Sequence, residues 1–169
     1  MSTMPAFTLS KKIFITFFLV AMGTAFFFSC FNSYDRTHFS PKQTGHHYKG
    51  SGQNQGFGDD FSYPMSYGEV IEVIHVHAFL IPLIIFVMSR ILSMTKAGEG
   101  VKIAVYVSAF IGVILNLSGP YLIIYSSEIF TTSLIASYII LGSCFITFIS
   151  LPIFKIWSKK PAKESEYWL

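Results

Sequence analysis

Charged residues are scarce in this chain, and four long stretches contain none. Asp, Glu, Lys and Arg make up only 12% of the 169 residues, about half the share of a soluble domain. The net charge is +3 and basic residues do not alternate with aromatic ones, which excludes nucleic-acid binding. The two cysteines form no Cys-x-x-Cys pattern, which excludes thioether-bound haem and thiol redox chemistry of that type.

Hydrophobic residues are abundant instead, at 52% of the chain, and they include 18 phenylalanines. The stretches without Asp, Glu, Lys or Arg cover residues 13–31, 73–89, 103–125 and 134–154. Each is near or above the roughly 17 to 25 residues that cross a bilayer. Because lipid offers no hydrogen-bond partners, the backbone there must be helical. The sequence therefore predicts an all-α integral membrane protein, a bundle of four helices in contact with the lipid bilayer.

The positions of Lys and Arg predict the orientation of this bundle. With the N-terminus inside, the outer side holds only Arg36, Lys42 and Lys49 of the 12 basic residues. We therefore expect both ends in the cytoplasm (N-in, C-in). The expected cytoplasmic segments are 1–12, 93–102 and 157–169, the transmembrane helices are 13–31, 69–92, 103–125 and 132–156, and the outer loops are 32–68 and 126–131.

The outer loop 32–68 is polar and dense in glycine, so we expect its middle to be mobile, as a tether or a lid. The other links are short, which makes the last three helices antiparallel neighbours. Lys11-Lys12, an apolar run and Ser29-Cys30 also resemble a lipoprotein signal, although Phe27 fits that pattern poorly. Cleavage there would leave a lipidated Cys30 and three helices.

Ionisable side chains at membrane depth are costly and usually face a bundle interior, so they are the leading candidates for a site. Glu69, Glu72, His75 and His77 enter the second helix from its outer end. The two histidines are about 200° apart around a regular helix, which disfavours a shared metal ion. Glu72 and His75 lie on one face and can share a hydrogen bond that fixes the imidazole tautomer.

Two prolines inside the helices predict kinks beside polar residues. Pro82 cannot donate to the carbonyl of Ala78, and Pro120 cannot donate to that of Asn116. We expect these kinks to frame a polar pocket in the outer half of the bundle. Asn116 also aligns with Ser108 and Gly112 at a spacing of four, which favours close helix packing.

Several ligands are compatible with these residues. Haem b needs a second axial ligand, from His38, His46 or His47 in the loop or from a second subunit. A copper or zinc ion would recruit the same imidazoles, with Met65 as a soft ligand. A quinone site or proton relay needs only Glu72 and His75. Against these readings, the paired histidines of the second helix are also typical of interfacial side chains, the loop histidines of solvated ones, and Asn116 of a link between helices.

Three segments carry a resemblance: Glu-Val-Ile-His-Val-His-Ala-Phe at 72–79, Gly-Pro-Tyr-Leu-Ile-Ile-Tyr at 119–125, and Ile156-Trp157. Over residues 66–157 the chain resembles small four-helix bacterial inner-membrane proteins without an assigned function. This resemblance implies a multi-pass protein of the cell inner membrane with loop 32–68 periplasmic or extracellular, and it implies no catalytic residue.

The favoured function is an accessory, non-enzymatic membrane protein with a haem, metal or quinone site near the outer leaflet, in a respiratory setting. The first alternative is a structural or assembly subunit that packs against another membrane subunit or a second copy of itself. The second alternative is a small proton-coupled transporter, for which helices three and four offer no charged residue at depth.

Overall fold

The computed structural model describes residues 8–50 and 63–158, and five helices make up most of this part of the chain. They are α1 (Leu9–Thr37), α2 (Pro41–Lys49), α3 (Tyr67–Ser93), α4 (Glu99–Tyr125) and α5 (Phe130–Trp157). All except α2 are long and apolar enough to cross a membrane. The described residues contain no strand, which confirms the all-α prediction.

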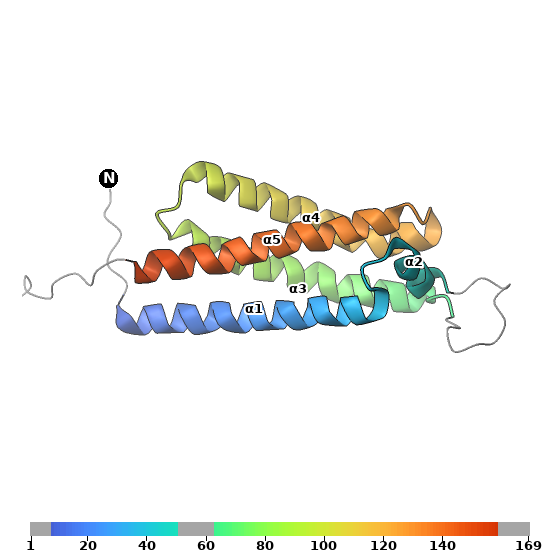
Figure 1. Cartoon of the computed structure of the whole chain (residues 1–169), viewed down its shortest axis with the longest axis horizontal. Coiled ribbons are helices and arrows are strands. Elements are labelled where there is room, and N and C mark those ends of the chain that lie inside the picture. The colour runs from blue at the N-terminus through green and yellow to red at the C-terminus, as the bar shows by residue number, and fades with distance from the viewer. Residues whose placement is uncertain (1–7, 51–62, 159–169) are drawn as a thin grey trace, which may run out of the picture.

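The four long helices run side by side, and α2 lies across one end of the bundle (Figure 1). Helix α5 packs against each of the other four helices. Helices α3, α4 and α5 are mutual neighbours, as their short links predict. Helix α1 packs against α5 and α2, and within the described residues no Cα atom of α1 comes within 8 Å of one in α3 or α4. The backbones of α1 and α3 therefore stand apart on one side of the bundle.

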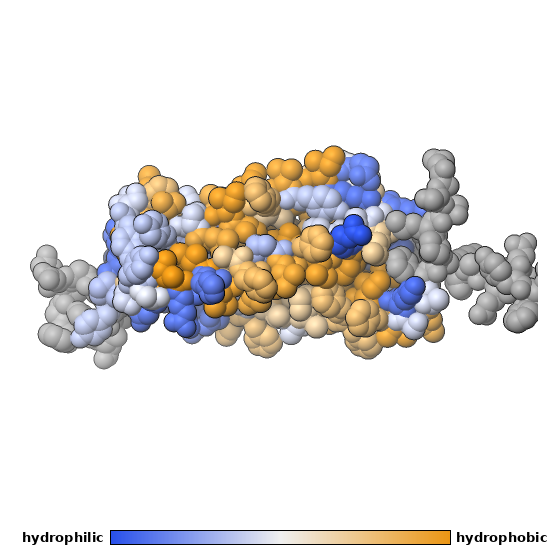
Figure 2. Space-filling view, turned by 180° about the vertical axis from the view of Figure 1, so that it is seen from behind, coloured by the Kyte–Doolittle hydropathy of each residue, from blue (hydrophilic) through white to orange (hydrophobic). Residues whose placement is uncertain are grey.

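The surface of the bundle is hydrophobic over its middle and polar towards both ends (Figure 2). Phe14, Phe17 and Phe27 on α1 each expose about two thirds or more of their surface, a state that water would penalise and lipid accepts. This belt has the pattern of a membrane-spanning surface.

Small residues on α4 let α5 approach closely. A Cβ added to Gly112 would lie 2.9 Å from the side chain of Leu141, and one added to Gly119 would lie 2.8 Å from that of Leu134. Between these two glycines, Asn116 Nδ2 donates a 3.2 Å hydrogen bond to Ser137 Oγ on α5. The predicted role of Gly112 and Asn116 in helix packing is thereby confirmed.

The two ends of the described chain lie together at the end of the bundle opposite α2 (Figure 1). There Trp157 Nε1 donates a 3.0 Å hydrogen bond to Thr16 Oγ1, which ties α5 to α1. Lys12 lies over the same indole ring, 5.7 Å from its centroid. The orientation of this end towards the cytoplasm stays a prediction.

The loop prediction is wrong for residues 32–37 and 41–49. Helix α1 extends to Thr37, six residues past its predicted end at residue 31, and Pro41–Lys49 forms α2. Helix α2 is anchored because Thr44, Gly45 and Tyr48 are buried against the bundle. Glycine density therefore misled the prediction here; the remaining glycine-rich stretch, 51–62, lies outside the described residues.

Candidate functional site: an open cavity between α1 and α3

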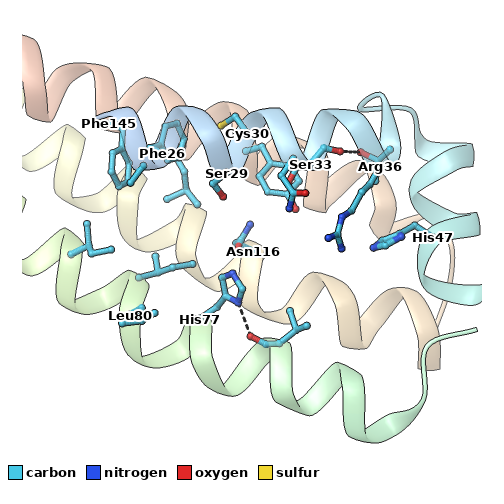
Figure 3. A pocket seen from close by; sticks show the side chains of 18 of the residues that line it. Phe26, Ser29, Cys30, Ser33, Arg36, His47, His77, Leu80, Asn116 and Phe145 are labelled. Carbon is cyan, nitrogen blue, oxygen red and sulfur yellow. Dashed lines mark hydrogen bonds between the residues drawn. The ribbon is translucent and has the colours of Figure 1, made fainter. Parts of the chain in front are cut away.

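The hydrophobic core is divided into two clusters, and a cavity of about 410 Å³ lies between them. Phe145 of the larger cluster and Tyr48 of the smaller one both line it. The cavity is near the α2 end, with α1 on one side, α3 on the other and α4 and α5 behind (Figure 3). A volume of this size falls within the range of small-molecule sites.

One face of α1 and one face of α3 form the two side walls. On α1 the lining residues recur at steps of four and three, from Met22 through Phe26, Ser29 and Ser33 to Arg36. On α3 the lining residues are Val73, His77, Leu80, Ile81 and Ile84. Ser29, Val73 and His77 line the cavity and are also exposed, so the cavity opens to the membrane between these helices.

The deep end of the cavity is apolar and aromatic. The rings of Phe26 and Phe145 are stacked, with centroids 4.3 Å apart and planes 10° from parallel. Met22, Leu80 and Ile84 complete this region. It suits the flat or aliphatic part of a ligand, since dispersion contacts with such a surface are not directional.

Two polar side chains face each other half-way along the cavity. The imidazole of His77 on α3 and the amide of Asn116 on α4 both point into it (Figure 3). His77 Nδ1 lies 2.7 Å from the carbonyl oxygen of Val73. Because a carbonyl only accepts, Nδ1 must carry the proton, and in the neutral ring Nε2 is left as a hydrogen-bond acceptor. The cavity thus contains a defined acceptor.

The end of the cavity next to α2 carries basic and phenolic groups. Arg36 from α1 and His47 from α2 lie near each other there (Figure 3), together with Tyr48. Burial and the charge of Arg36 lower the pKa of His47 below its usual value. Burial, together with the neighbouring phenol of Tyr138, raises the pKa of Tyr48 well above its usual value, so this phenol stays protonated.

The sequence-predicted candidates on α3 separate into different roles. His77 lines the cavity, whereas Glu72 and His75 are exposed and do not line it. Within the described residues no hydrogen bond joins Glu72 to His75, so the predicted pairing of these side chains is not formed.

Glu69 belongs to a capping box at the start of α3. Its Oε2 accepts hydrogen bonds from the backbone N–H and the hydroxyl of Ser66, at 2.7 and 2.8 Å. In return, the Ser66 hydroxyl oxygen accepts a hydrogen bond from the backbone N–H of Glu69. The spacing Ser66-x-x-Glu69 is the sequence signal for this cap. Glu69 therefore fixes the start of the helix.

The candidate residues of the predicted loop also differ in whether they line the cavity. His47 and Met65 line the cavity, whereas His46 does not. His38 caps α1 in the left-handed conformation with φ of 45°, and its ring packs edge-on against Tyr34. Sequence reasoning missed Arg36 and Tyr48 as lining residues, because it placed both in a mobile loop.

The two prolines lie differently relative to the cavity. Pro120 lines a small adjoining cavity together with His77 and Asn116, whereas Pro82 lines neither. Helices α3 and α4 are continuous through both residues. Within residues 8–50 and 63–158, no three His, Cys, Asp or Glu side chains come together as a metal site.

The fold defines a multi-pass membrane protein with four transmembrane helices. Residues 38–163 match a family of transmembrane helical domains, and the chain belongs to this family. The match starts after α1, so it includes His47, His77 and Asn116 but not the α1 wall of the cavity. Comparisons with curated proteins and with solved structures gave no match.

Proposed function

We propose that this chain is an accessory protein of a bacterial inner membrane that binds a quinone in the cavity between α1 and α3. The observation that carries the proposal is a pair of polar side chains, His77 and Asn116, half-way along a cavity that has an apolar end and opens to the membrane. The α2 end of the bundle is then the outer end, which puts the site in the outer leaflet of a respiratory membrane.

A quinone fits the chemistry of the lining better than haem or a metal ion. It reaches its site by diffusion in the lipid, and the opening between α1 and α3 provides a path. The stacked pair Phe26 and Phe145 offers an aromatic surface next to the polar groups. Haem or a metal ion needs converging ligands, and the imidazoles of His47 and His77 stand apart in the cavity (Figure 3).

The tautomer of His77 further favours the reduced form of the ligand. With Nδ1 bonded to the Val73 carbonyl, Nε2 accepts a hydrogen bond from a quinol hydroxyl, and a quinone carbonyl has no proton to donate. The Asn116 amide donates one N–H to Ser137, which leaves its second N–H as a donor and its carbonyl oxygen as a second acceptor beside His77 Nε2. We expect a quinol to bind more tightly than its quinone.

The test is a titration of the detergent-purified chain with decylubiquinone and decylubiquinol, with the variants His77→Leu and His75→Leu. Both variants remove one imidazole from α3, but only His77 lines the cavity. Loss of one hydrogen bond should weaken quinol binding about three- to tenfold in His77→Leu, and His75→Leu should bind like the wild type.

A second pair of variants separates binding from packing. Ser137→Ala breaks the bond between α4 and α5 but leaves the Asn116 amide in the cavity, whereas Asn116→Leu removes that amide. Only Asn116→Leu should weaken quinol binding. Equal affinities of all four variants would refute the site, and an absence of saturable binding to the wild type would favour the structural or assembly subunit instead.

A further inference from the structure

In the part of the chain that the structure describes, the α2 end of the cavity carries a positive charge and no carboxylate. Arg36 and His47 lie there side by side (Figure 3), and none of the residues that line the cavity is Asp or Glu. The acidic residues of the described part are Asp35, Glu69, Glu72, Glu99 and Glu128, and none of them lines the cavity. Within the described residues, Arg36 therefore lines the mouth of the cavity with no carboxylate in the same lining.

Among the described residues, the guanidinium of Arg36 makes neither an ion pair nor a hydrogen bond. In the described part of the chain the only ion pair joins Lys102 to Glu99 at the opposite end. Arg36 is exposed beyond the apolar belt, where a long basic side chain reaches the headgroup region of a membrane. The five N–H donors of a guanidinium in a fixed plane match the oxygens of a phosphate.

We propose that this mouth, formed by Arg36, His47 and Tyr48, binds the phosphate group of an anionic phospholipid. Arg36 forms a bidentate pair with the phosphate oxygens, and the His47 ring is an additional donor. The acyl chains follow the opening between α1 and α3, where the lining turns apolar at Leu80 and Ile84. The phosphate position at Arg36 is separate from the polar pair His77 and Asn116, whereas the acyl chains and the proposed quinone share the apolar walls at Leu80 and Ile84.

A lipid is favoured over free phosphate because of what surrounds the mouth. The cavity opens to the membrane between two helices, and its lining becomes apolar beyond His77 and Asn116, at Phe26, Leu80 and Ile84. A free anion would use only the polar end, whereas a phospholipid uses the charge and the apolar walls together. The described lining contains Arg36 and no Asp or Glu, which favours a lipid with net negative charge over a zwitterionic one.

The experiment uses the full chain in nanodiscs of phosphatidylcholine, with and without phosphatidylglycerol, and native mass spectrometry to count the retained lipid. The variant is Arg36→Gln, and its matched control is Lys42→Gln, which removes the same charge from an exposed α2 position that does not line the cavity. Arg36→Gln should retain phosphatidylglycerol about tenfold less well, because a charge-assisted bidentate contact is lost. Lys42→Gln should stay within about twofold of the wild type.

A conservative variant of Arg36 and a comparison with inorganic phosphate test the proposal further. Arg36→Lys keeps the charge but loses the planar fork, so it should retain an intermediate amount of lipid even if the glutamine variant folds poorly. Equal loss in Arg36→Gln and Lys42→Gln, or no preference of the wild type for phosphatidylglycerol, would overturn the proposal. If inorganic phosphate raised the melting temperature of the protein and phosphatidylglycerol did not, the mouth of the cavity would be a site for a free anion. That result would overturn the lipid proposal. The quinol affinity of Arg36→Gln is measured separately, because it tests the proposed quinone position at His77 and Asn116.

Discussion

Replacing Gly119 by alanine should destabilise the bundle, because the space that a Cβ needs is already occupied. The added atom would lie 2.8 Å from Leu134 Cδ1 and 3.1 Å from Leu134 Cβ. A rotamer change can move Cδ1, but Cβ is fixed to the α5 backbone, so the two helices must separate slightly. Leu134 is 1% exposed and has little room to adjust.

The magnitude follows from two opposing effects. Overpacking a close contact costs about 1 to 3 kcal/mol, and the fixed Cβ puts Gly119 in the upper part of this range. Alanine regains about 1 kcal/mol of helix propensity relative to glycine. The residue before Pro120 is also restricted for any side chain with a Cβ, which adds to the cost. The net loss should be about 1 to 2 kcal/mol.

The assay is reversible unfolding of the purified protein in mixed micelles with increasing sodium dodecyl sulfate, followed by circular dichroism. The control is Gly100→Ala in the same helix, where an added Cβ meets nothing within 4 Å, and it should be as stable as the wild type or slightly more stable. Leu134→Ala makes room, so Gly119→Ala should cost less in that background. A Gly119→Ala protein as stable as Gly100→Ala would refute this reasoning.

Three further predictions concern the ends of the bundle. His38→Gly should raise the free energy of unfolding by up to about 1 kcal/mol in the same assay, because φ of 45° at a helix C-cap suits glycine. Trp157→Phe should cost about 0.5 kcal/mol, and Thr16→Val should add nothing to it, because both break one hydrogen bond. The pKa of His47, which faces Arg36 and Tyr48, is lowered from 6.5 by burial and by Arg36. As the pH falls, the unfolded chain therefore binds a proton at His47 before the folded chain does, so the free energy of unfolding should decrease below about pH 7. The decrease should be smaller in His47→Gln. An unchanged pH dependence in that variant would contradict the lowered pKa of His47.

The four long helices could be predicted from the sequence because lipid leaves the backbone few choices. Apolar length and the lack of charge fixed the last three helices to within four residues at either end, and α1 differs more because its polar end stays helical. The residues from Asn32 to Thr37 contain no glycine or proline to end the helix. Their polarity reflects a position beyond the apolar belt and gives no sign of a loop.

The candidate site could be predicted only in part. His77 and Asn116 follow from a rule about polar side chains at membrane depth, and both line the cavity. Arg36 and His47 reach it through the turn at His38 and the docking of α2, which are tertiary features without a periodic signal. Helical spacing correctly separated His75 from His77, but it could not tell which of the two faces an opening between helices.

The central claim is that the cavity between α1 and α3 takes up a ligand from the membrane. The most direct measurement is photolabelling of the full chain in nanodiscs with an azidoquinone, with the labelled peptides located by mass spectrometry. The account predicts labels on α1 between Met22 and Arg36 and on α3 between Val73 and Ile84, suppressed by excess decylubiquinol. Labels that excess decylubiquinol does not suppress, spread over outward-facing residues such as Phe14 and Phe86, would contradict it.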